Sequence, residues 1–263
     1  MSNRIDETLK KLRKAHTPAL GPFMTVGFPT VELSERLAQT ILESGGDFIE
    51  LAVPFSDPLA DGPTIQKTSL VALKQGANVA TVLEVVRNLR SRGVEAPLIL
   101  MGYMNPYLRY GLERFIEDSA RSGVDGFIIP DLPTEESETV RVLCDKHDLC
   151  LIPLLAPTST DERIQDACQH ARGFIYCVSL RGVTGARTSL SEGLAGFVAR
   201  VRKHTDLPIM VGFGISSREH IEEISAFADG AIVASALLDA IGRAAPGTEI
   251  EVAKSFIKSL KGN

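Results

Sequence analysis

Short apolar segments alternate with longer amphipathic segments along most of this chain. In the longer segments hydrophobic side chains recur every three or four residues, for example at Leu33, Leu37 and Ile41, which predicts helices with one buried face. The short apolar runs between them are typical of strands that are buried on both faces. These predicted strands are Leu20–Val26, Phe48–Ala52, Leu98–Tyr103, Gly126–Pro130, Leu149–Leu154, Phe174–Val178, Ile209–Gly212 and Gly230–Ala234. The alternation predicts a parallel sheet whose strands are connected by helices.

The number of these strand and helix units favours a closed barrel. Eight units in a chain of 263 residues are typical of a (β/α)8 TIM barrel. A doubly wound open sheet is the alternative, but no G-x-G-x-x-G motif follows the first predicted strand. No linker or low-complexity tract interrupts the pattern, so we expect residues 1–263 to form a single TIM-barrel domain. In Arg4–Lys14 the stripe of Ile5, Leu9 and Leu12 predicts an extra N-terminal helix.

The segment FIELAVPFSDPLADGPT, residues 48–64, carries the strongest sign of chemistry. Glu50 lies within a predicted buried strand, where a carboxylate costs several kcal/mol unless it is paired, protonated or used. Alternation along the strand places Glu50 on the face opposite its aliphatic neighbours. The proline-rich loop that follows adds Asp57 and Asp61. The pattern favours an acid/base site, and the alternative is a structural glutamate held by an arginine or by backbone donors.

Glycine-containing loops after the last predicted strands indicate a phosphate site. In a TIM barrel the active site lies at the carboxyl ends of the strands, and phosphate often binds after strands 7 and 8. Gly214 stands in such a loop ahead of a helix, and Ser235 leads into the helix after the eighth predicted strand. Glycine lets backbone N–H groups approach an anion, and the helix adds its positive end. Each residue alone can simply end a strand, but their joint placement favours phosphate binding.

Other chemistries have weaker support in the sequence. A Schiff-base enzyme needs a desolvated lysine at a strand end, whereas every lysine here falls in a predicted helix or loop. The histidines are scattered rather than clustered like metal ligands, and no G-x-S-x-G motif is present. Tyr103 and Tyr176, near strand ends, are either part of the site wall or core aromatics with a hydrogen-bonded hydroxyl. We expect carboxylate chemistry with a phosphate anchor and no metal.

The composition narrows the class of protein further. The net charge is -5 and no stretch is rich in lysine and arginine, so nothing indicates a nucleic-acid partner. No apolar stretch approaches the roughly 20 residues of a membrane span, and the charged start MSNRIDETLKKLRKAH lacks the apolar core of a signal peptide. The four cysteines show neither a CxxC nor a zinc-like spacing. We therefore expect a cytoplasmic protein with reduced thiols.

Several motifs resemble those of the α subunit of tryptophan synthase. They are PFSDPLADGPTIQ (Pro54–Gln66), YMNP (Tyr103–Pro106), GFIIPDLPTEES (Gly126–Ser137), the Val183-Thr184-Gly185 segment of GVTG, and GFGIS (Gly212–Ser216). The similarity runs from Phe23 to Leu238 in the family's order and spacing, and the acidic-loop motif is long and highly specific. The sequence departs from the pattern at Ala52 and Ala234, where glycine is expected in many members, and the second lies at the phosphate loop.

The resemblance implies a (β/α)8 barrel that cleaves indole-3-glycerol phosphate to indole and glyceraldehyde 3-phosphate, a retro-aldol reaction without a cofactor. Carried over by position, Glu50 matches the family's catalytic glutamate and Asp61 its catalytic aspartate. Matches to the phosphate site are Thr184, Gly185, Phe213, Gly214 and Ser235, and matches to the substrate pocket are Phe23, Tyr103 and Tyr176.

The same resemblance implies a partner. The family normally works with a pyridoxal-phosphate β subunit that consumes the indole, in an expected α2β2 heterotetramer, and the Asp57-Pro58 loop falls where the family contacts it. The loop Ser179–Glu192 is long and rich in Gly, Ser and Thr, and such loops are either disordered or lids; its place over the expected site favours a lid. The resemblance implies that the partner favours the closed state of this lid. The alternatives are a stand-alone lyase, another phosphate-binding barrel such as an isomerase, or a barrel that mainly activates a partner. The intact pair of Glu50 and Asp61 argues against the last, and the sequence does not separate an α subunit from a stand-alone lyase.

Overall fold

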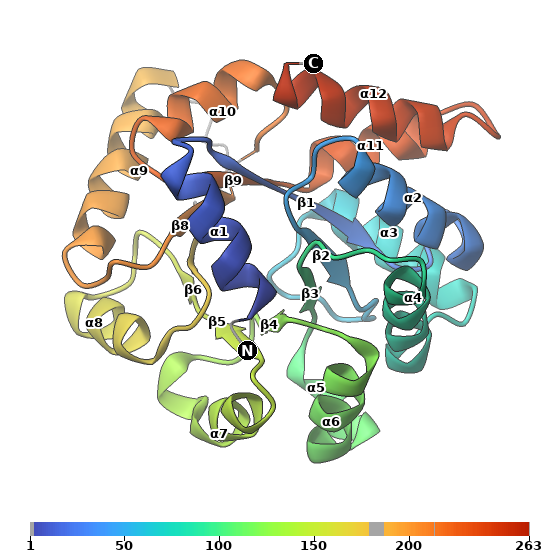
Figure 1. The fold of residues 1–263 in the computed structure, drawn as a ribbon, viewed down its shortest axis with the longest axis horizontal. Coiled ribbons are helices and arrows are strands. Elements are labelled where there is room, and N and C mark those ends of the chain that lie inside the picture. The colour runs from blue at the N-terminus through green and yellow to red at the C-terminus, as the bar shows by residue number, and fades with distance from the viewer. Residues whose placement is uncertain (1–2, 179–186, 213, 263) are drawn as a thin grey trace.

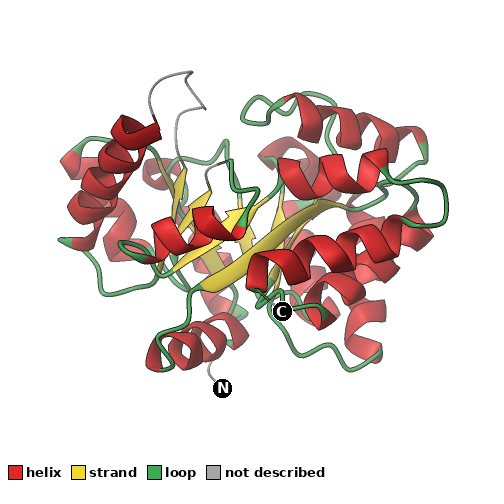
Figure 2. Cartoon of the chain, turned by 90° about the horizontal axis from the view of Figure 1, so that it is seen from above, coloured by secondary structure: helices red, strands yellow, loops and turns green. Residues whose placement is uncertain are grey.

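Nine parallel strands form a nearly closed barrel with helices around it (Figures 1 and 2). The computed structural model describes residues 3–178, 187–212 and 214–262, with the side chains of residues 187–192 excepted. The strand order is β5-β4-β3-β2-β1-β9-β8-β7-β6. The strands are β1 (Ala19–Thr25), β2 (Ile49–Ala52), β3 (Leu98–Met101), β4 (Gly126–Ile128), β5 (Cys150–Ile152), β6 (Leu154–Leu155), β7 (Ile175–Val178), β8 (Ile209–Gly212) and β9 (Gly230–Val233). The predicted TIM barrel is confirmed.

The helices follow the strands in the predicted alternation. They are α1 (Arg4–Lys14), α2 (Val31–Glu43), α3 (Pro63–Lys74), α4 (Val79–Ser91), α5 (Met104–Tyr110), α6 (Leu112–Ser122), the 3-10 turn η1 (Thr134–Glu136), α7 (Glu138–Lys146), α8 (Asp161–His170), α9 (Arg187–Arg202), α10 (Arg218–Ser225), α11 (Ser235–Arg243) and α12 (Glu249–Lys261). Within the described ranges, none of these helices is long and apolar enough to cross a membrane.

The fifth predicted strand, Leu149–Leu154, is divided by Pro153. Its first part, β5, pairs with β4, and its second part, β6, pairs with β7. Proline has no N–H to donate to a strand ladder, so the pairing changes partner at this residue. The carbonyl of Pro153 still accepts the backbone N–H of Tyr176 at 3.1 Å, which bridges the gap. One predicted strand therefore becomes two without opening the barrel.

An aspartate stands just before each of the strands β2, β4 and β9 and holds the amino end of a neighbouring strand. Each aspartate makes two hydrogen bonds to a single residue at the amino end of the neighbouring strand. Its backbone N–H donates to the carbonyl of that residue, and its carboxylate accepts the backbone N–H of that residue. The pairs are Asp47 with Leu20, Asp125 with Leu98 and Asp229 with Ile209, and the carboxylates also pair with Lys261, Arg90 and Arg202 respectively. These contacts fix the strand register at the end of the barrel opposite the expected site.

Helix α1 lies across that same amino end (Figure 1). Its Ile5 and Leu9 pack into the barrel interior in one cluster with Phe48 and Phe174. Asn3 caps the helix and donates its side-chain N–H to the carbonyls of residues 125 and 148. The amino end is thus filled with apolar side chains, so a site inside the barrel must open at the carboxyl end.

Candidate active site

Glu50 occupies the interior of the barrel on β2. Strand register places it between Phe23 of β1 and Ile99 of β3. Its side chain is 0% exposed, and among the described residues neither carboxyl oxygen has a hydrogen-bond partner. Burial raises the pKa of this carboxyl to about 8. In the described part of the chain neither an arginine nor a backbone donor holds Glu50, so the structure does not support the structural-glutamate alternative.

Asp61 lies half-buried in the loop after β2 and is held from several sides. Burial raises its pKa to about 6, and hydrogen bonding from the Tyr103 side chain opposes that shift. The Tyr103 hydroxyl also accepts the backbone N–H of Ala60 at 3.1 Å. The backbone N–H of Asp61 donates to the Pro58 carbonyl at 3.1 Å, and its own carbonyl accepts Nε2 of Gln66 at 2.9 Å. The loop is therefore ordered by its own contacts and by the end of β3.

Tyr176 on β7 is close enough to both acids for their charges to act on its hydroxyl. Burial raises the pKa of its hydroxyl well above the ordinary value, and the negative charges of Glu50 and Asp61 raise it further. The hydroxyl lies against the backbone of Gly212 at the end of β8, where an added Cβ would stand 2.5 Å from its oxygen. Electrostatics thus links the two acids on β2 and its loop to a hydroxyl that comes from the other side of the barrel.

The three predicted pocket residues are all buried. Phe23, Tyr103 and Tyr176 are 1%, 4% and 7% exposed. Phe23 lies beside Glu50 in register, and the Tyr103 ring packs on Phe55 with 5.4 Å between ring centroids. These aromatic side chains thus lie next to the two predicted acids, with Phe23 beside Glu50 and Tyr103 beside Asp61.

The predicted phosphate residues follow adjacent strands. Gly214 comes after β8 and Ser235 opens α11 directly after β9, and the two strands are paired. Gly214 has φ +43°, a left-handed conformation that favours glycine, and an added Cβ there would meet nothing within 4 Å. Ser235 is exposed, and no described side chain caps the N-terminus of α11 at Ala234. Unpaired N–H groups at a helix start suit an anion.

Three predicted phosphate-site residues, Thr184, Gly185 and Phe213, lie outside the described residues. Residues 179–186 of the predicted lid do so as well, so the lid stays a prediction. Sequence reasoning also missed two features of the site. The Gln66 contact to Asp61 and the space that Gly212 leaves for Tyr176 depend on side-chain directions, although a glycine at the end of a strand was a usable signal.

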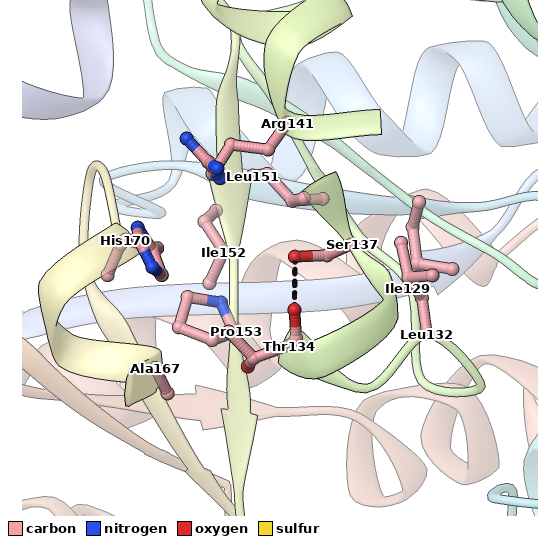
Figure 3. Close-up of a pocket in the computed structure, with 11 residues that line it drawn as sticks. Ile129, Leu132, Thr134, Ser137, Arg141, Leu151, Ile152, Pro153, Ala167 and His170 are labelled. Atoms are coloured by element: carbon pink, nitrogen blue, oxygen red, sulfur yellow. Dashed lines mark hydrogen bonds between the residues drawn. The ribbon is translucent and has the colours of Figure 1, made fainter. Parts of the chain in front are cut away.

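Other hollows in the molecule do not contain the predicted acids. The crevice in Figure 3 lies between α7, α8 and β5, and its wall combines Arg141 and His170 with the hydrogen-bonded Thr134 and Ser137 and several apolar side chains. Its volume of about 20 Å³ has room for about one water molecule and none for an indole ring. Two larger hollows, of about 510 and 270 Å³, lie beside α1 at the amino end of the barrel. Neither Glu50 nor Asp61 lines any of these three spaces.

The described residues also bear on metal and thiol chemistry. Within the described ranges, no group of three His, Cys, Asp or Glu side chains gathers into a possible metal site. The four cysteines are free and buried, and burial raises the pKa of their thiols; they are Cys144, Cys150, Cys168 and Cys177. Buried thiols with raised pKa values are poor nucleophiles.

Comparison with known proteins gives one consistent family. The sequence profile described as "Tryptophan synthase alpha chain" matches residues 9–261. The tryptophan synthase alpha chain of Roseiflexus sp. (strain RS-1) is 50% identical over 99% of this chain and 100% of its own length. The crystal structure of tryptophan synthase subunit alpha from Legionella pneumophila superposes with a TM-score of 0.92 at 37% identity, covering 100% of this chain and 98% of that one. A structure of tryptophan synthase from M. tuberculosis in an aminoacrylate-bound form gives 0.89 at 33% identity, with 98% of each chain covered.

Proposed function

The chain belongs to the tryptophan synthase alpha chain family, whose members are lyases that cleave indole-3-glycerol phosphate, and we propose that Glu50 and Asp61 carry out this cleavage. Membership gives the chain its place in tryptophan biosynthesis as an alpha subunit. The observation that carries the assignment of residues is the burial of Glu50 in the barrel interior with no described hydrogen-bond partner. Burying a carboxyl group without a hydrogen-bond partner is unfavourable, and such a group is available to interact with a bound substrate.

Glu50 is the proton donor and acceptor in this proposal. With a pKa of about 8 it carries a proton at neutral pH and can transfer it to C3 of the indole ring. Protonated C3 makes the ring an indoleninium, which accepts the electron pair when the bond from C3 to the glycerol chain breaks. The hydroxyl next to that bond becomes the aldehyde and returns its proton to the Glu50 carboxylate. Glu50 is therefore protonated both before and after the reaction, so the step is balanced in protons.

Asp61 supplies negative charge in the same step. Its pKa of about 6 leaves it mainly ionised at neutral pH. A fixed carboxylate near the ring nitrogen stabilises the positive charge that develops when C3 is protonated, which is electrostatic preorganisation. Phe23, Tyr103 and Tyr176 form the wall that holds the ring in a site of low polarity. Low polarity strengthens the interaction between Asp61 and the developing charge.

The phosphate group of the substrate fixes the position of the substrate in the site. We assign it to the backbone around Gly214 and the start of α11 at Ser235, with Thr184, Gly185 and Phe213 as further contacts. The open left-handed turn at Gly214 and the uncapped helix start support this assignment. Holding the phosphate away from the reacting bond contributes orientation without chemistry.

The partner in this proposal is a tryptophan synthase β subunit in an α2β2 heterotetramer, with its contact at the Asp57-Pro58 loop. Asp57 is exposed there, and the next apolar residue, Leu59, is 92% exposed. A partner that binds this loop would cover the Leu59 side chain and remove its apolar surface from water. We further propose that residues 1–263 act as one domain in the cytoplasm.

One assay tests the proposal. The purified chain is supplied with indole-3-glycerol phosphate, and indole is measured with and without a β subunit, beside a Glu50→Gln control. Indole release that the control abolishes supports the assignment. Full activity without any response to a β subunit would favour the stand-alone lyase. No indole under either condition would refute the proposed cleavage reaction.

A further inference from the structure

A single hydrogen bond joins the helix after the acidic loop to the helix of the proposed phosphate site. Thr64 stands in the first turn of α3, three residues after Asp61, and donates its hydroxyl to Oδ1 of Asp239 on α11 at 3.1 Å. Asp239 lies four residues after Ser235, so the two occupy the same face of α11, one turn apart. The contact thus lies between the residue proposed to stabilise charge and the helix start proposed to bind phosphate.

Helix α3 is fixed to the acidic loop at its start and to the barrel further along. The side chain of Gln66 donates to the Asp61 carbonyl at 2.9 Å, which ties the loop to the first turn of α3. The hydroxyls of Thr68 and Thr25 share a buried hydrogen bond of 2.7 Å, which ties the second turn to β1. Thr64 lies in the same first turn, so its hydrogen bond to Asp239 bears on the direction of the helix start and of the loop before it.

We propose that Asp239 is a positioning residue, which sets the acidic loop through Thr64 so that anion binding at α11 and the orientation of Asp61 are coupled. The inference rests on the proposed function, because it takes its two ends from the proposed site. A hydroxyl that donates to a carboxylate makes a stronger hydrogen bond than a neutral pair, and both side chains are half-buried. Catalysis depends steeply on geometry, so even a small shift of Asp61 lowers the rate.

Variants of both partners test the contact. Thr64→Val and Asp239→Leu remove the hydrogen bond, whereas Thr64→Ser and Asp239→Asn keep a donor and an acceptor. We expect kcat for indole release to fall about tenfold in each removing variant and no further in the double variant, while the conserving variants stay within about twofold. A role limited to stability would lower the unfolding temperature and leave kcat unchanged, and that result would overturn the inference.

A matched control removes a comparable contact elsewhere. Nδ2 of Asn88 on α4 donates to Glu35 on α2 at 2.8 Å, which also joins two neighbouring helices, and neither helix carries a proposed site residue. Asn88→Ala should leave kcat within about twofold of wild type, as expected for a surface change away from the site. A loss in Asn88→Ala equal to that in Thr64→Val would mean that any helix contact has the same effect, and would overturn the assignment to Asp239.

A spectroscopic measurement separates this inference from the proposed function. In protein with labelled carboxyl carbons, the NMR signal of Asp61 is followed while glycerol 3-phosphate is added. We expect the ligand to shift this signal in wild type, and the shift to fall to less than about half in Thr64→Val at saturating ligand. Equal shifts in the two proteins would overturn the coupling even if wild type releases indole. A coupled shift without indole release would overturn the proposed reaction and leave the coupling standing.

Discussion

The hydroxyl of Tyr176 fills the space that Gly212 leaves on the neighbouring strand. Tyr176 and Gly212 come from β7 and β8, and a Cβ added to Gly212 would stand 2.5 Å from the tyrosine oxygen and 2.7 Å from the nearest ring carbon. No real Cβ approaches another atom so closely, so glycine at this position sets the depth at which the tyrosine sits. Because the pKa of Tyr176 responds to Glu50 and Asp61, this packing contact also bears on the proposed site.

Gly212→Ala should therefore damage both packing and function. The added methyl group must displace the tyrosine ring, and such overpacking typically costs about 1–3 kcal/mol of folding free energy. We expect a lower free energy of unfolding in denaturant titrations and a higher KM for indole-3-glycerol phosphate. Gly196→Ala is the control, because a Cβ at this exposed helical glycine meets nothing within 4 Å. It should be neutral or stabilise α9 by about 0.5–1 kcal/mol. An unchanged KM in Gly212→Ala would show that Tyr176 does not border the substrate.

Replacing Glu50 with glutamine should abolish turnover and leave the fold intact. The side chains are almost the same shape, but glutamine cannot exchange the proton, and an acid/base group contributes about 10²–10⁴-fold to the rate. The measurement is indole formation at saturating substrate, with circular dichroism to check the fold. Activity within about threefold of wild type would leave Glu50 without the catalytic role, since that loss is far below the contribution of a general acid.

The same substitution should change how stability depends on pH. The pKa of Glu50 is raised from 4.5 in the unfolded chain to about 8 in the folded protein, so between these values the folded state binds more protons. The contribution of this group to stability is therefore largest below pH 4.5, decreases as the pH rises through that window, and is lost above about 8. The slope approaches about 1.4 kcal/mol per pH unit. Urea titrations between pH 6 and 9, at roughly one-unit steps, should show this decline in wild type and not in Glu50→Gln. Parallel curves for the two proteins would indicate that Glu50 is not the group that titrates.

Asp61 should set the acidic limit of activity. Catalysis in the proposed mechanism needs Asp61 ionised, above its pKa of about 6, and Glu50 protonated, below its pKa of about 8. The plot of kcat/KM against pH should therefore be bell-shaped with apparent limits near these values. Asp61→Asn should lower kcat, because losing one preorganised electrostatic contact raises the activation free energy by about 2–4 kcal/mol. A change in KM alone would make Asp61 a binding contact instead.

A carboxylate at Gly214 should repel the phosphate. Gly214→Asp places a negative charge beside the anion, whereas Gly214→Asn has the same size without the charge. Both residue types tolerate the left-handed conformation at φ +43°, and the site is open, so stability should change little in either variant. We expect stabilisation by inorganic phosphate in thermal melts to be lost in the aspartate variant and kept in the asparagine variant. Equal protection of both variants would remove Gly214 from the phosphate site.

The sequence allowed much of the barrel to be predicted because local patterns determine it. Each observed strand overlaps a predicted apolar run, and α1 has the predicted bounds Arg4–Lys14. The division of one strand at Pro153 was missed, because hydropathy does not report which partner a strand pairs with. The position of Glu50 in the interior followed from strand alternation, but its lack of a described partner could only be seen in three dimensions. Contacts such as Thr64 with Asp239 join residues 175 positions apart, and no local pattern encodes them.

The last prediction concerns the exposed end of the acidic loop. Leu59 is 92% exposed, and Asp57 in the same loop is exposed as well, so both side chains are accessible to a partner. If a β subunit binds there, adding it should raise indole release at least tenfold, which corresponds to about 1.4 kcal/mol of coupling. Leu59→Asp should remove this activation and leave the basal rate of the isolated chain unchanged, because the side chain points into solvent and not toward Glu50. Leu70→Asp is the matched control, since Leu70 on α3 is also exposed, at 52%. Equal loss of activation in both variants would contradict a contact centred on the loop. Activation that survives Leu59→Asp would place the partner on another face of the barrel.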